Sequence, residues 1–180
     1  MMGLERNAYL DEMRGRLDQA IANYVQYTHN AVDTNGLGHT VADQRLRQLV
    51  TTIVDSLARP NPQRGGQDVK EALILLEHAF DRWGTYQTTL NEERRSMRFV
   101  RQLFQGLLVF EQLVNLIAMP GTQPAEVQVA AVSLLHVMCK HDPPSSWRLL
   151  KYNSGIAIRR LIPLLAVVAP AELASLAVKV

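Results

Sequence analysis

Residues 126–140, which read EVQVAAVSLLHVMCK, decide the fold. Apolar side chains fill most of this stretch at helical spacing, with an acid at its beginning and Lys140 at its end. Both charges complement a helix dipole, so the stretch predicts a strongly apolar helix. Residues 69–78, VKEALILLEH, match residues 127–136, VQVAAVSLLH, at an offset of 58. The chain therefore carries an internal repeat of a helical segment.

Further matches extend the repeat toward the end of the chain. Residues 111–118, EQLVNLIA, align with residues 159–166, RRLIPLLA, and residues 125–132 align with residues 171–178. Each unit reads as an apolar helix, a turn and a second helix. The predicted organisation is a single domain over residues 1–180, made of a helix and turn at 4–37, a degenerate repeat at 38–83, a repeat at 97–141 and an apparently truncated repeat at 145–180.

The remaining chain also favours helices. Apolar residues recur at helical spacing between residues 10 and 28, which predicts one long amphipathic helix over residues 4–29. The proline- and glycine-rich segment 59–66 predicts a loop. A helix over 68–83 follows, and we expect Gly84 to close it. No segment shows the alternation of a β-strand, so the predicted class is all-α.

The junction at residues 152–165, YNSGIAIRRLIPLL, resembles the armadillo family of repeats, in which a short helix ends at a glycine before a leucine-rich one. Residues 126–135 are similar to the start of that family's long third helix. The resemblance is best over residues 97–180 and implies a right-handed α-solenoid of armadillo-like repeats with an N-terminal capping helix. HEAT-type repeats or an irregular helical bundle would produce a similar pattern, and both alternatives stay open.

The resemblance also implies a binding surface. In an armadillo-like repeat the third helices line a concave face that holds a segment of another protein. The corresponding helices here would lie at 68–83, 124–141 and 170–180. In the peptide-binding members each such helix carries a tryptophan and, four residues on, an asparagine. The corresponding places hold Val132 and His136 in one unit and Ile74 and His78 in another.

The predicted partner-binding residues on this concave face are His78, Val132 and His136. The alternative interpretation of the two histidines is that they are half-buried packing residues. The function that the resemblance implies is a non-enzymatic scaffold or adaptor that binds another protein.

A second candidate surface is a basic stripe at i, i+4 and i+7 of one predicted helix, formed by Arg94, Arg95, Arg98 and Arg101. Phosphate, nucleic acid or an anionic lipid would dock on such a stripe. The neighbouring acids at 92 and 93 favour a solvated charged face instead. With 19 basic against 17 acidic residues, the composition also argues against a dedicated nucleic-acid binder.

No catalytic residue, cofactor or metal site is predicted. His136, Cys139, His141 and Asp142 crowd one short segment, but they lack the paired spacing of a zinc site. No motif places a nucleophile beside a base. The sequence therefore predicts a binding protein and not an enzyme.

The two ends of the chain lead to expectations about compartment and partners. Residues 1–5 lack the pattern of a secretory signal, and no stretch is long and apolar enough to span a bilayer, so we expect an intracellular, cytoplasmic protein. The predicted helix over 170–180 ends the chain without a polar cap. Either a partner subunit or a second copy of the chain covers it, or the protein continues beyond residue 180, or the chain holds fewer repeats than this alignment predicts.

Overall fold

The computed structural model describes residues 2–30, 37–59, 62–64, 66–90, 102–103, 108–118 and 124–142, together with residues 151 and 159. Within these residues the chain is helical and contains no strand. The elements are α1 (Met2–Asn30), α2 (Leu37–Ala58), the 3₁₀ turn η1 (Pro62–Arg64), α3 (Gln67–Leu90), α5 (Val109–Ala118) and α6 (Ala125–His141). The prediction of an all-α chain is confirmed for these residues.

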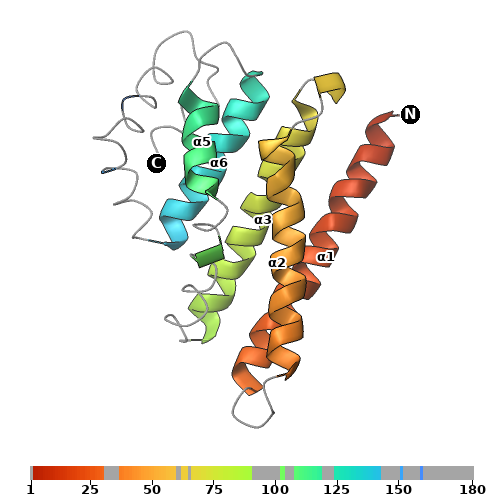
Figure 1. The fold of residues 1–180 in the computed structure, drawn as a ribbon, viewed down its shortest axis with the longest axis vertical. Coiled ribbons are helices and arrows are strands. Elements are labelled where there is room, and N and C mark those ends of the chain that lie inside the picture. The colour runs from red at the N-terminus through yellow and green to blue at the C-terminus, as the bar shows by residue number, and fades with distance from the viewer. Residues whose placement is uncertain are drawn as a thin grey trace.

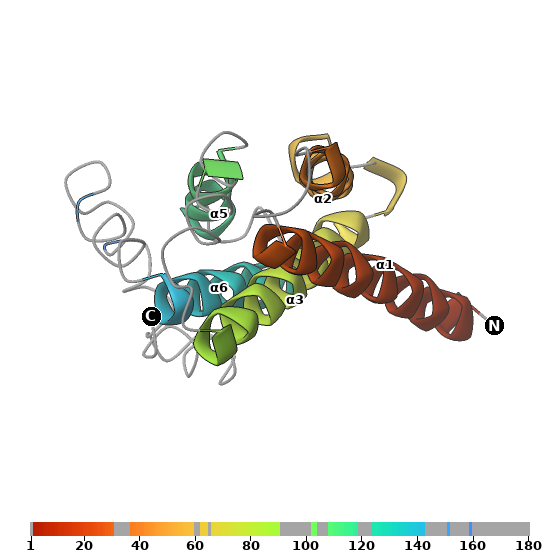
Figure 2. The same ribbon diagram turned by 90° about the horizontal axis from the view of Figure 1, so that it is seen from below.

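The helices lie in two layers (Figure 2). One layer holds α1, α3 and α6, and the other holds α2 and α5. The chain reverses direction between α2 and α3 and again between α5 and α6, so that α3 and α6 run the same way (Figure 1). Helices α1, α2 and α3 pack against one another, α6 packs on α3, and α5 packs on α6. The described residues thus form two helical hairpins side by side, with α1 against the first.

Apolar residues at helical spacing hold α1 to its neighbours. Met13, Leu17, Ile21 and Tyr24 form one buried stripe, and the Tyr24 ring lies 5.1 Å from the ring of Trp83 in α3. Burial raises the pKa of Tyr24 to about 12, with a smaller contribution from the charge of a nearby aspartate, so its hydroxyl stays neutral. The stripe fixes α1 through apolar contact and not through charge.

Buried leucines form the contact between α3 and α6. Four leucines at this contact are 0% exposed: Leu73 and Leu76 of α3, and Leu134 and Leu135 of α6. Phe110 of α5 packs in the same core cluster. Burying side chains of this size contributes about 1.5–3 kcal/mol each, so this contact determines how the second hairpin sits on the first.

Several boundaries follow the sequence pattern, and one does not. The long first helix and the helix over 126–140 are confirmed, and the expected loop contains η1 and a left-handed Gly66 with φ of 83°. The prediction that Gly84 ends its helix is wrong, because α3 continues to Leu90. Residues 97–101 of the repeat predicted at 97–141 lie outside the described residues, as does the repeat predicted at 145–180 apart from residues 151 and 159.

No helix in the described part of the chain combines the length and the apolar character that crossing a lipid bilayer requires.

Candidate functional site

Polar side chains from three parallel helices meet along the outer side of the α1/α3/α6 layer. The other sides of these helices pack in the apolar core, so the polar side chains lie on the surface of the layer. We call this surface the polar face. Its members are Asp18, Lys70, Glu77, His78, Asp81, Arg82, Glu126, Ser133, Lys140 and His141.

One aspartate joins α1 to α3. His78 Nε2 lies 2.9 Å from Asp18 Oδ1, and Arg82 Nε donates to the same oxygen over 3.1 Å. An ionised carboxylate only accepts hydrogen bonds, so the His78 ring uses Nε2 as a donor here. The predicted partner-binding residue His78 is therefore half-buried and already engaged within the fold.

Three sets of contacts join α3 to α6. Ser133 Oγ donates to Glu77 Oε1 over 2.7 Å near the middle of the helices. Lys70 pairs with Glu126 near their beginning, and the hydrogen bond and charge of this ammonium lower the pKa of Glu126. Polar contacts thus run along the helices and are not confined to one end.

Asp81 anchors the far end of the same contact. His141 Nε2 lies 2.8 Å and Lys140 Nζ 3.3 Å from Asp81 Oδ1. The hydrogen bond from His141 is the largest cause of a lowered pKa at Asp81, and Lys140 adds to it against the opposing effect of burial. The last turn of α6 is therefore fastened to α3 through an ionised carboxylate.

These contacts share a nearly constant register. The paired residues of α3 and α6 are separated by 56 to 60 positions in the chain. Matching segments of the sequence repeat at an offset of 58. Repeat-equivalent positions of α3 and α6 therefore lie beside one another, as two parallel helices with the same apolar pattern require.

Gly84 lets the end of α6 approach α3 closely. A Cβ built on Gly84 would lie 2.2 Å from the His141 ring, far inside van der Waals contact. The His141 side chain is 11% exposed, so its ring fills the space above the glycine while its Nε2 faces Asp81. The glycine thus serves packing between two helices and not helix termination.

The other residues of the predicted site have different environments. Val132 is 0% exposed and belongs to the core, so its side chain is not available to a partner in this arrangement. His136 is half-buried on α6. The basic stripe of Arg94, Arg95, Arg98 and Arg101 lies outside the described residues, as does the helix expected over 170–180.

The acidic partners on the polar face were not among the residues selected from the sequence. Asp18, Glu77 and Asp81 each accept from a residue 56 to 64 positions further along the chain. The only available signal was the repeat itself, because carboxylates of one helix and basic or hydroxyl groups of the next recur at about the repeat offset. That signal can be interpreted only once α3 and α6 are known to lie side by side.

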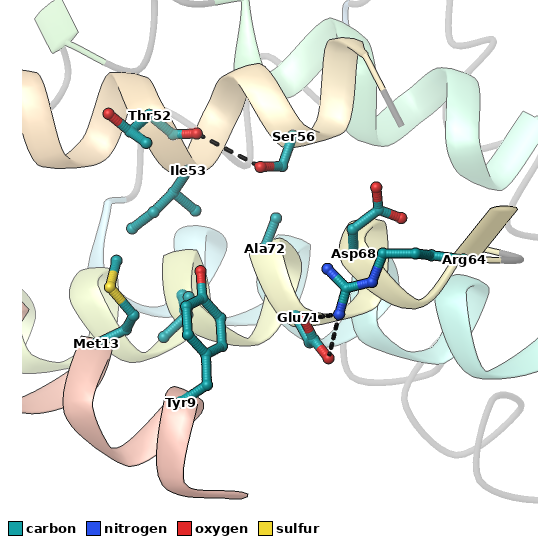
Figure 3. Close-up of a pocket in the computed structure, with 10 residues that line it drawn as sticks. Tyr9, Met13, Thr52, Ile53, Ser56, Arg64, Asp68, Glu71 and Ala72 are labelled. Carbon is teal, nitrogen blue, oxygen red and sulfur yellow. Dashed lines mark hydrogen bonds and ion pairs between the residues drawn. The ribbon is translucent and has the colours of Figure 1, made fainter. Parts of the chain in front are cut away.

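A small pocket lies where α1, α2 and the beginning of α3 meet (Figure 3). Arg64 reaches across it to Glu71, whose side chain is 4% exposed, with Nη2 lying 3.1 Å from Oε2. Gln67 Nε2 also donates to this carboxylate over 3.1 Å. The buried charge is therefore compensated.

The pocket encloses about 60 Å³. Pockets for small organic ligands measure roughly 300–1,000 Å³, so only a few water molecules fit here. Within the described residues, no group of three metal-ligating side chains converges in a way that could hold a metal ion. The geometry offers more for surface recognition than for an enclosed ligand.

The chain matches no protein-family model, no curated protein and no solved structure.

Proposed function

We propose that this chain is a non-enzymatic interaction module of armadillo-like helical repeats, which binds a segment of another protein across the polar face. The observation that carries the proposal is the constant register of α3 and α6, whose cross-helix contacts recur from Lys70 to His141. Two hairpins repeated in register create one continuous surface, and repeat proteins bind extended partners on such surfaces.

The chemistry of the face suits a polar or main-chain partner. A lysine ammonium has three donors, and an ionised carboxylate has about four acceptor sites, so each pair retains hydrogen-bonding capacity toward solvent. The side chains of Arg82 and Lys140 are 44% and 56% exposed. The face carries both donors and acceptors, and a bound polypeptide offers both N–H and C=O groups to them.

The contacts of the face also favour binding over catalysis. The Ser133 hydroxyl donates to Glu77 and thereby links two helices. A serine nucleophile instead requires a base that accepts its proton and a third group that orients the base. Asp81 is likewise occupied by two basic groups that stabilise its ionised form.

Charge exchange tests this proposal while preserving the fold. The double variant Lys70→Glu with Glu126→Lys retains an ion pair between α3 and α6 but reverses both local charges. The matched control is Asp43→Lys with Arg47→Glu, which reverses an ion pair of 2.8 Å on α2 in the other layer. Circular dichroism first confirms that both variants have the helix content of the original chain.

The readout is affinity capture from source cells, followed by titration of the identified partner. We expect the partner to bind the original chain and the control equally, and the polar-face variant at least about tenfold more weakly. Equal dissociation constants for all three proteins would show that the polar face is not the binding surface.

A further inference from the structure

A second surface differs from the polar face in both shape and charge. Helices α1 and α2 border an open groove of about 830 Å³, lined by α1 residues between Tyr9 and Asn23 and by α2 residues between Arg45 and Thr52. The α1 part of the lining extends about 21 Å at 1.5 Å per residue. The groove is therefore long enough to contact about four turns of another helix.

The layer arrangement also gives the groove the position of a helix. Each of α3 and α6 has an antiparallel hairpin partner in the other layer, α2 and α5 respectively. Helix α1 runs antiparallel to α2 and packs on both α2 and α3, so α1 and α3 share α2 as their partner in that layer. The place beside α2 and over the outer part of α1 holds no described element (Figure 2). A helix entering there would extend the α2/α5 layer by one member.

The walls of the groove are suited to a close helix contact. Gly15 is exposed, and a Cβ built on it would meet no atom within 4 Å, so a partner backbone can approach α1 there. Half-buried Ala20 and Leu49 supply apolar surface from opposite walls. Such a groove accepts the apolar face of an amphipathic helix.

Two arginines give the groove its charge preference. Arg16 of α1 and Arg45 of α2 both line it and are exposed, and neither forms an ion pair with a described residue. The only hydrogen bond from the Arg16 guanidinium to a described residue is with the Met13 sulfur, at 3.8 Å. By contrast, Arg14, Arg47 and Arg82 each bind a carboxylate.

We propose that this groove binds an amphipathic helix of another protein, with carboxylates on the flanks of that helix pairing with Arg16 and Arg45. Glu12 is the only carboxylate in the lining, so the groove attracts acidic partners and disfavours basic ones. Apolar residues at i, i+3, i+4 and i+7 of the partner would lie against Ala20 and Leu49. Helix α1 contributes Asp18 to the polar face and other residues to this groove, but the contacts that carry the polar-face proposal join α3 to α6, so the groove does not depend on that proposal.

A displayed library of helical 16-residue peptides with randomised surface positions tests the site. The library is selected on the original chain and then measured against three variants. Arg16→Glu with Arg45→Glu reverses the charge, Gly15→Phe fills the groove, and Arg59→Glu is a control of the same charge type on an exposed residue outside the lining. Because a side chain on Gly15 meets open space, Gly15→Phe should retain the fold.

We expect the selected peptides to be acidic and amphipathic. The charge-reversal and Gly15→Phe variants should each bind them at least about tenfold more weakly, whereas Arg59→Glu should bind within about twofold of the original chain. No selection, selection of basic peptides, or binding that survives both groove variants would overturn the proposal. So would a dimer of the chain that Gly15→Phe converts to a folded monomer by light scattering, because the occupant would then be a second copy.

Discussion

Helices α3 and α6 meet through an apolar core closed by polar contacts, whereas α1 and α2 diverge enough to leave a groove of about 830 Å³. At the first contact, Glu77, Asp81 and Glu126 all have partners across the interface. At the second, Arg16 and Arg45 have no carboxylate partner among the described residues. One contact is thus complete within the chain, and the other retains groups that a further helix could satisfy.

Two glycines illustrate the same difference. Gly84 has the His141 ring against it, so any side chain there would displace a neighbour. Gly15 has open space where a side chain would be. A glycine within a helix therefore indicates either an existing close contact or room for one, and only the tertiary arrangement distinguishes the two.

The largest expected difference between the two regions concerns core truncation. Leu134→Ala removes a side chain that is 0% exposed, so we expect a loss of about 2–5 kcal/mol in the free energy of unfolding. Leu49→Ala removes the same atoms from a half-buried position in the groove, and the expected loss is about 1 kcal/mol or less. Urea denaturation followed by circular dichroism measures both. Equal losses would mean that the groove wall is packed as tightly as the α3–α6 contact.

The glycine substitutions should have opposite signs. Gly15→Ala should stabilise the chain by about 0.5–1 kcal/mol, because alanine favours the helix and meets no neighbour. Gly84→Ala should displace the His141 ring and break its contact with Asp81, for a net loss of about 1 kcal/mol.

A double variant isolates the cause of the Gly84 effect. With His141→Ala in place, Gly84→Ala should no longer destabilise the chain and should show the stabilising effect of the alanine alone. Thermal and urea unfolding give the four values that this cycle needs. If the loss at Gly84 persists without the histidine ring, the close contact is not its cause.

The sequence could predict most helix positions but not the contacts between them. The periodic residues of α1 and the repeat between 69–78 and 127–136 indicated helices and equivalent positions, because both are local patterns. Gly84 was interpreted as a helix end, since its actual role depends on a histidine 57 positions later. The pairing of Asp18 with His78 was missing from the sequence prediction for the same reason.

The candidate site shows the same limit. His78 and His136 were selected as equivalent positions of one binding surface, and the structure places them on the neighbouring helices α3 and α6. Val132 was selected by the same alignment, but it is fully buried. Sequence periodicity assigns a residue to a turn of a helix, whereas its exposure also depends on which neighbours cover that turn.

The smallest expected effect is the pH dependence contributed by Asp81. Its pKa is lowered in the folded chain from the usual 3.8, chiefly by the hydrogen bond from His141, so the unfolded chain takes up this proton more readily as the pH falls. The contribution is therefore complete above the unfolded pKa and is lost as the pH falls through the lower, folded pKa. Asp81→Asn should lower the free energy of unfolding at pH 6, and the loss should become progressively smaller below pH 3.8. Urea titrations at successive pH values measure this loss.

A second variant tests the cause. In a His141→Gln background the difference in free energy of unfolding between aspartate and asparagine at position 81 should shrink, because the main cause of the lowered pKa has been removed. A pH profile of that difference that His141→Gln leaves unchanged would assign the lowered pKa to Lys140 instead.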